Sequence, residues 1–362
     1  MKKRTLKKTK NKPRDNNILT KPIYLGDKDI PMSIELLQYD ALRMEVKNMT
    51  LQSSIKENID NSKVNWFKIS GISDATQVNR ICREFGLHGF DVKDLLADQQ
   101  VVKIVAYDDV TFVLMSSFYL EPNITGLDDM QIAFIFGNNF IVSFQEALIP
   151  VFEEVKQDIE ENNGLIRQKG TDFLLYILLN AVNLSNINTI MGIEDYLAEI
   201  EDQLIVRKDS IDILQFLHRC RVDYMHIKRS VISLREEYAN LLHNTNKLIS
   251  TENIVYFNDF DDRMRTMLGD LASFHESLTS LHRAERHYEA FYRDYRHFSS
   301  PHPFGRLVWH EFQIYAGDRV EVWLYFLMVS FGCRCHFHIF VDEETKMVLM
   351  TIYLECIVLY RK

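Results

Sequence analysis

The sequence predicts an α/β domain followed by long antiparallel helices that form a stalk. The 362 residues include only 13 Gly and 7 Pro, and such low counts favour long helices over a Gly-punctuated sandwich. Apolar residues follow mixed strand and helix patterns up to residue 146 and a helical period after residue 150. Four parts are therefore expected: a basic disordered tail (1–29), the α/β domain (30–195), long stalk helices (196–281) and a C-terminal tail (282–362).

Charge is divided unevenly along the chain. The net charge is −9, but residues 1–14 carry eight Lys or Arg and no acid, so the rest of the chain is more acidic than the total indicates. The basic tail lacks the apolar segment of a secretory signal, and we expect it to be solvated, with docking to anionic lipid as the alternative. The acidic body argues against nucleic acid as the main partner and favours cations.

The first predicted elements lie between residues 66 and 88. The run Trp66–Ser70 is rich in aromatic and β-branched residues and predicts a short strand. Residues Ala75–His88 predict a helix, with Asp74 as its N-cap and Gly86 as its stop signal.

The second set of predicted elements is β-rich. Residues 101–107 and 110–120 each predict a strand. Two apolar stretches then flank Gly137, Asn138 and Asn139, and this arrangement predicts a hairpin because these residues tolerate positive φ. Beyond Pro150 we expect no further strands.

Two apolar seams predict a pair of long helices. Their members recur three and four residues apart, which is the spacing of a helix that packs on another helix. The second helix begins with Asp259, Asp261 and Asp262. The seam residues are Ile213, Leu217, Cys220, Tyr224, Ile227, Val231, Leu234, Tyr238 and Leu241 in the first helix, and Met264, Met267, Leu271, Phe274, Leu278 and Leu281 in the second.

Two absences limit the function classes. The sequence has no uninterrupted apolar run of about 20 residues, so the chain as written is not predicted to span a membrane. It also has no P-loop, nucleophile elbow, dinucleotide fingerprint or H-E-x-x-H motif, so no enzyme activity is predicted and no catalytic or cofactor-binding residue is assigned.

The cysteines fall into two groups. Cys82 and Cys220 are isolated and are expected to be reduced core thiols of a cytoplasmic protein. The run CRCHFH (333–338) has two Cys and two His that could bind Zn²⁺, namely Cys333, Cys335, His336 and His338. This spacing fits no common zinc finger, so a zinc site is the weaker interpretation.

Three segments together resemble the cytoplasmic domain of the CorA family of magnesium channels. They are Phe85–Ser116, the hairpin Ile135–Glu146 and the paired long helices, and the likeness spans about residues 74–281. The resemblance implies a homopentameric funnel in the cell (inner) membrane, with the N-terminal domain in the cytoplasm. It implies that a stalk helix enters the membrane as the pore helix, and that a Gly-Met-Asn loop links it to a second membrane helix. The transported ion would be Mg²⁺, with Co²⁺ as a second candidate.

The resemblance also implies regulatory metal sites between subunits. The family's pattern assigns a metal-linked carboxylate to Asp94 in FDVKDLL and the facing carboxylate to Asp259 in YFNDFDDR. Mg²⁺ prefers such oxygen ligands and keeps several waters, so one or two carboxylates from each subunit suffice. Lys93 stands where the family often has an acid, which argues against a second adjacent ion. Bound Mg²⁺ would favour a closed ring, and its loss would let the pore open.

The family's membrane half is missing from the written sequence. Residues 283–323 are charged and rich in His, and they contain no Gly-Met-Asn. Charges at bilayer depth are costly, so this segment is not expected to span a membrane.

A frameshift is our hypothesis for the missing half. Residues Trp309–Gly317 can be back-translated so that a shift of one nucleotide gives Gly-Met-Asn-Phe-Lys-Tyr-Met-Pro, and the flanking residues allow two apolar spans. In the same frame, Met347–Val348 must give a Trp and Met350–Thr351 must give a stop after a basic tail. We hypothesise that the chain is translated from a frameshifted CorA-type gene from about Leu278–Leu281 onward. The alternative is a soluble helical protein that binds metal or a partner without transport.

Overall fold

The computed structural model describes residues 21–98, 101–120, 127–206, 211–243, 245–298, 307–308, 320–328, 333–341 and 348–356. The chain divides into two compact units, Met1–His282 and Arg283–Lys362. The helices are α1 (Ala75–Glu84), α2 (Gly89–Leu95), α3 (Glu153–Glu161), α4 (Thr171–Val206), α5 (Ile211–His243) and α6 (Ile254–Phe298), with a short 3-10 helix at Lys56–Asn58.

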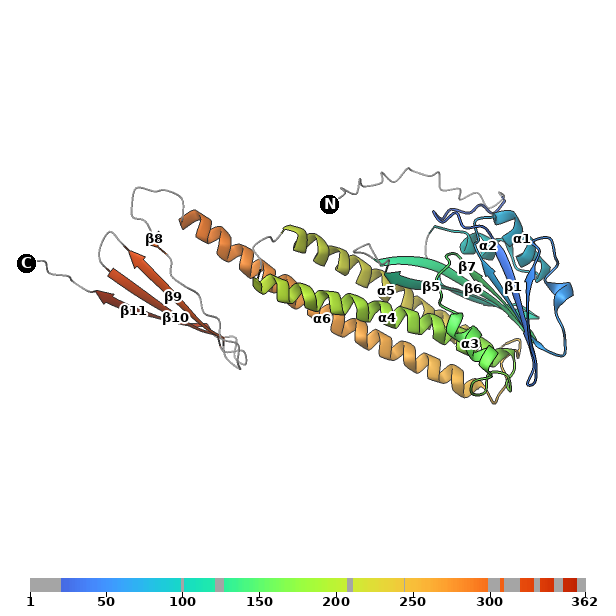
Figure 1. The fold of residues 1–362 in the computed structure, drawn as a ribbon. Coiled ribbons are helices and arrows are strands. Elements are labelled where there is room, and N and C mark those ends of the chain that lie inside the picture. Colours follow the sequence, from blue (N-terminus) through green and yellow to red (C-terminus); the bar gives the residue numbers. More distant parts are fainter. Residues whose placement is uncertain are drawn as a thin grey trace, which may run out of the picture. The chain divides into compact units, whose positions relative to one another are not determined.

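The first unit is built on a seven-stranded sheet (Figure 1). The strand order is β2-β1-β3-β7-β6-β5-β4, and neighbours are antiparallel except β3 and β7, which run parallel. The strands are β1 (Ser33–Tyr39), β2 (Met44–Met49), β3 (Val64–Ser70), β4 (Lys103–Ala106), β5 (Val110–Leu120), β6 (Leu127–Gly137) and β7 (Phe140–Gln145). The strands predicted from the sequence are confirmed, and the predicted α/β class is correct.

Both faces of the sheet are buried. In β5, Phe112 and Leu114 belong to a core that includes residues of α1 and α2, whereas Val113 and Met115 belong to a core that includes residues of α3 to α6. Successive side chains of a strand point to opposite faces, so one strand contributes residues to both cores. This double burial explains why the sequence of β5 is an almost continuous apolar run rather than an alternating one.

The helix predicted at residues 75–88 is shorter in the structure. Its predicted N-cap is confirmed, because the Asp74 side chain accepts hydrogen bonds from the backbone N–H groups of Thr76 and Gln77. The helix ends at Glu84 rather than at residue 88. Gly86 has φ of 75°, a left-handed conformation that ends the helix and that Gly adopts readily.

The hairpin at residues 137–139 is confirmed, but the reason given for it is wrong. None of these three residues is among the described residues that have a positive φ. Gly137 is needed for space instead, since a Cβ there would lie 2.3 Å from the ring of Phe140. The turn therefore selects Gly for close approach rather than for backbone conformation.

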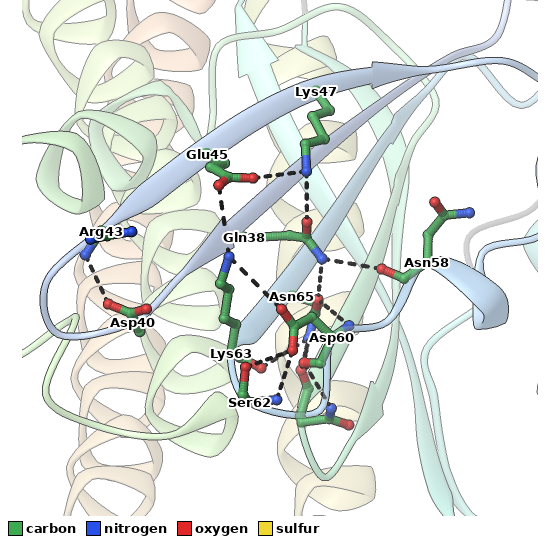
Figure 2. Close-up of polar contacts among 11 residues, drawn as sticks. Gln38, Asp40, Arg43, Glu45, Lys47, Asn58, Asp60, Ser62, Lys63 and Asn65 are labelled. Carbon is green, nitrogen blue, oxygen red and sulfur yellow. Dashed lines mark hydrogen bonds and ion pairs between the residues drawn. The ribbon is translucent and has the colours of Figure 1, made fainter.

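A buried polar cluster joins this turn to the start of β3 (Figure 2). Asn65 is fully buried, and its Nδ2 donates to the backbone oxygens of Asp60, Lys63 and Asn139 at 2.8–2.9 Å. Its Oδ1 accepts from Gln38 Nε2 at 2.8 Å. These bonds satisfy the buried amide and fix two loops that are far apart in the sequence.

The two predicted helical seams pack together. From Leu217 onward the predicted α5 seam residues are buried, as are all those of α6, and Tyr224 of α5 contacts the Phe274 ring of α6 at 5.8 Å. A third helix, α4, which the sequence patterns did not predict, also belongs to this core. α4 adds Ile190, Ile193 and others to it, and α4, α5 and α6 run side by side (Figure 1).

One helix in the described part of the chain is long and apolar enough to cross a membrane, at Thr171–Ala198 of α4. Of the apolar 18-residue window within this range, 61% is buried inside the molecule. Leu174 and Leu178 lie in the core on the sheet, so the apolar composition of α4 serves packing.

The second unit contains a four-stranded antiparallel sheet in the order β11-β10-β9-β8. The expectation of no strands beyond Pro150 is therefore wrong. Runs such as VEVWLYFLM and VLMTIYLEC are rich in β-branched and aromatic residues, which favour strands. The strands are β8 (Leu307–Val308), β9 (Val320–Met328), β10 (Cys333–Val341) and β11 (Val348–Cys356).

Candidate metal centre

Asp94 lies on α2, a short helix held by its cap and by its apolar face. The helix follows His88, whose Nδ1 accepts a hydrogen bond from the backbone N–H of Phe90 at 3.3 Å. Val92 and Leu95 are buried in the core on one face of the sheet. The Asp94 side chain remains 33% exposed, so water and ions can reach it.

An amine from strand β4 pairs with Asp94. Lys103 Nζ lies 2.9 Å from Asp94 Oδ2 and 2.7 Å from Asp91 Oδ1. Burial lowers the pKa of Lys103, but the hydrogen bonds and charges of the two carboxylates outweigh burial, and the net pKa is raised. Lys103 is therefore an ammonium at neutral pH, and it bridges two carboxylates that lie three residues apart on one helix.

Asp91 is the buried member of this group. Its side chain is 5% exposed, and it accepts a hydrogen bond from the Tyr107 hydroxyl as well as the contact from Lys103. The backbone N–H of His88 donates to the Tyr107 oxygen at 3.0 Å. Burial, and then the bond to Asp91, raises the pKa of Tyr107, so the phenol stays protonated and acts as a donor. Asp91 thus has two side-chain donors from outside its helix.

Asp259 lies near the start of α6. Arg263, one turn further on, places Nε 2.7 Å from Asp259 Oδ2, and the Tyr176 hydroxyl of α4 donates to the same oxygen at 3.0 Å. The hydrogen bond from Arg263 is the main cause that lowers the pKa of Asp259. The side chain is 47% exposed, so this carboxylate is ionised and accessible at neutral pH.

The other two acids at the start of α6 differ from Asp259 in exposure. Asp261 is 17% exposed and contacts Arg265 at 2.5 Å and Arg235 of α5 at 3.4 Å. Asp262 is 75% exposed and lies 3.8 Å from Arg265. Asp261 therefore ties α6 to α5, whereas Asp262 faces solvent.

The structure does not join the two predicted site residues within one chain. The described side-chain contacts of Asp94 and those of Asp259 have no residue in common. Within the described ranges, no group of three or more His, Cys, Asp or Glu side chains could hold a metal ion. Each carboxylate can supply part of a hydrated Mg²⁺ site, and a complete site needs ligands from water or from another chain.

The structure tests the prediction for one of the two groups of cysteines. Cys82 and Cys220 are free and buried, and burial raises the pKa of both thiols, to about 12 for Cys220. Both are therefore inert core residues, as predicted. The side chains of Cys333, Cys335, His336 and His338 lie outside the described residues, so the zinc interpretation stays untested.

Sequence reasoning missed three residues of the Asp94 group: Asp91, Lys103 and Tyr107. Asp91 had a signal, because a carboxylate three residues before Asp94 must share its helix face. Lys103 and Tyr107 had none: Lys103 begins β4 and Tyr107 follows it, and both reach α2 only through the packing of the sheet.

Comparison with known proteins identifies the family of this chain. A model of the family described as CorA-like Mg2+ transporter protein matches residues 61–286, more than half of the chain. The cobalt/magnesium transport protein CorA of Thermotoga maritima is 26% identical over 259 residues, which cover 72% of this chain and 74% of that protein. The cobalt/magnesium transport protein CorA of Methanocaldococcus jannaschii is 20% identical over 206 residues, covering 57% and 64%.

Solved structures of CorA and ZntB proteins share the fold of this chain. The complete CorA magnesium transporter from Methanocaldococcus jannaschii aligns with a TM-score of 0.60 at 16% identity, covering 73% of this chain and 79% of that chain. The ZntB cytoplasmic domain from Vibrio parahaemolyticus aligns with a TM-score of 0.54 at 13% identity, covering 72% and 99%. At these identities the structures establish the fold alone, and the family match carries the assignment. This chain belongs to the family of CorA-like Mg²⁺ transporter proteins.

Proposed function

We propose that the chain is a subunit of a divalent-cation channel that transports Mg²⁺, with Co²⁺ as a second ion, across the cell (inner) membrane. The family match over residues 61–286 is the observation that supports transport. The CorA relative from Thermotoga maritima, a cobalt/magnesium transport protein, supports the choice of ions. The fold does not select the ion, because CorA and ZntB structures both align with it. The active form is proposed to be a homopentamer.

Asp94 and Asp259 are proposed to bind regulatory Mg²⁺ between neighbouring subunits. Each already pairs with a basic side chain of its own chain, but both carboxylates are partly exposed, which leaves room for the metal, water and a neighbouring subunit. Mg²⁺ suits such a site because it retains several waters and needs only one or two carboxylates.

The proposed mechanism is a ligand-biased equilibrium between closed and open rings. Bound Mg²⁺ neutralises carboxylates of adjacent subunits and favours the closed, symmetric arrangement. When cytoplasmic Mg²⁺ falls, the ion dissociates, the subunits separate more easily and the pore opens. The metal can shift this equilibrium only by its difference in affinity for the two states.

The regulatory role is tested by the double substitution Asp94→Asn with Asp259→Asn in the purified full chain. We expect the Mg²⁺ concentration that protects the chain from trypsin to rise at least about tenfold, since two ligands are lost. Asp262→Asn is the control because it removes the same charge from a solvent-exposed position on the same helix. Unchanged protection in the double variant would show that these residues are not the site.

A second function follows from the written sequence of the second unit. In the written frame, the residues between Gly317 and the position of the shifted stop form strands β9 and β10 in the structure. A chain made in this frame would be a soluble or peripheral protein that binds metal or a partner without transport. Carbonate extraction of membranes separates the two functions, because a channel subunit stays in the membrane and the written chain is released. Resequencing the gene tests the frameshift. If the codons cannot encode Gly-Met-Asn in the shifted frame, the frameshift is ruled out.

A further inference from the structure

One oxygen of Asp94 is already in contact with a cation of its own chain. Lys103 Nζ lies 2.9 Å from Asp94 Oδ2. A Mg²⁺ ion bound directly to that oxygen would lie about 2.0–2.1 Å from it. An ammonium and a divalent ion that contact the same carboxylate oxygen repel each other, so the contact with Lys103 weakens metal binding there. Metal binding at this oxygen therefore competes with the contact between Lys103 and Asp94.

Lys103 keeps a second ion-pair partner, Asp91, when its contact with Asp94 breaks. Its second partner, Asp91, is 2.7 Å away and only 5% exposed, whereas Asp94 is 33% exposed. Removing the partner of a buried charge costs far more than breaking a partly exposed pair. The ion pair between Lys103 and Asp91 is thus the stronger of the two, and we expect the ion pair between Lys103 and Asp94 to break first.

The backbone of β4 holds the ammonium in this position. Lys103 pairs with Leu114 of β5 in the sheet register. The next residue, Ile104, donates its backbone N–H to Glu237 Oε2 of α5 at 3.3 Å. Because both neighbouring elements fix this segment, only the end of the Lys103 side chain has to move.

We infer that Lys103 is a built-in competitor for the metal at Asp94. Its ammonium occupies the carboxylate when Mg²⁺ is scarce and sets the Mg²⁺ concentration at which the site fills. This inference rests on the proposed role of Asp94. It adds that the metal-free Asp94 carboxylate keeps an ion pair within its own subunit, so loss of Mg²⁺ does not leave it without a cationic partner.

The test is a Mg²⁺ titration of trypsin protection in the full chain carrying Lys103→Gln. We expect the midpoint to fall roughly three- to tenfold, as befits the loss of one partly exposed ion pair. Lys156→Gln is the matched control, because Lys156 pairs with Glu35 at 2.7 Å, is 23% exposed and removes the same charge elsewhere in the domain. Its midpoint should stay within about twofold of the wild type.

Two further variants keep the test decisive. Asp91→Asn with Lys103→Gln removes the competitor without leaving a buried unpaired carboxylate, and its midpoint should also fall. In an Asp94→Asn background, Lys103→Gln should have no effect. The inference is overturned if both Lys103 variants keep the wild-type midpoint while Asp94→Asn raises it, or if Lys103→Gln lowers the midpoint equally without Asp94. If Asp94→Asn itself changes nothing, the Asp94 site is absent and the inference fails with it.

Discussion

Two regions of the first unit pair a carboxylate with a basic side chain in different ways. At α2 the partner of Asp94 comes from strand β4, and a buried second carboxylate, Asp91, anchors it. At the start of α6 the partner of Asp259 is Arg263, one turn further along the same helix. The first arrangement depends on tertiary structure and the second on local spacing. The difference teaches that similar exposed carboxylates can have partners of very different structural importance.

The largest loss of unfolding free energy is expected at Asp91, the buried carboxylate of the α2 region. Asp91→Asn removes the charge that holds Lys103, and we expect the free energy of unfolding to fall by about 2 kcal/mol, since one partner of a largely buried pair is lost. Thermal unfolding in EDTA measures this. Asp94→Asn, at the more exposed carboxylate, should cost less than about 1 kcal/mol. Equal losses would show that burial does not distinguish the two carboxylates.

A smaller effect is expected where α6 meets α5. Asp261 is 17% exposed and contacts both Arg235 and Arg265. Asp261→Asn should cost about 1 kcal/mol of unfolding free energy, because charged hydrogen bonds in a partly buried position are lost. Asp262→Asn, on the exposed face, should cost less than about 0.3 kcal/mol. Urea unfolding of the two variants measures this difference. An equal shift of the two unfolding midpoints would contradict the role of Asp261 in joining α6 to α5.

The smallest effect is expected at the local pair, and it should depend on pH. Arg263 lowers the folded-state pKa of Asp259 below its ordinary 3.8, so the pair stabilises the fold above that value and its contribution is lost as the pH falls through the lowered pKa. Arg263→Gln should cost about 0.3–0.5 kcal/mol at pH 7, as for exposed pairs one turn apart. The cost should shrink as the pH falls through the lowered pKa. Urea unfolding of wild type and variant over a series of falling pH values checks this, and a cost that stays unchanged at low pH would rule out the ion pair as its source.

Much of the fold could be predicted because local rules and burial agree in it. Asp74 caps α1 through its own side chain, and the seam from Leu217 to Leu241 is buried as its spacing requires. The predicted stop signal, Gly86, lies just beyond the end of α1 at Glu84 and adopts the left-handed conformation. At Gly137 the prediction gave the wrong reason, because the close approach of the Phe140 ring selects Gly there and the backbone conformation does not.

The site could be predicted only in part, because one of its residues reaches it through strand pairing. The resemblance supplied Asp94 and Asp259, and helix spacing could have supplied Asp91 and Arg263. Lys103 could not be found in this way. It reaches α2 only because β4 pairs with β5 beside that helix, and strand pairing is not visible in the local sequence.

The order of the seven strands has a consequence for self-association. A sheet edge with unpaired backbone groups invites a strand from another chain. At one edge, β4 packs against α5, and Glu237 accepts the N–H of Ile104. At the other edge, β2 is short and carries exposed Glu45 and Lys47, which lie 2.8 Å apart (Figure 2). Both edges are thus protected against strand addition, so copies of this chain are expected to assemble through side-chain surfaces and not by extending the sheet.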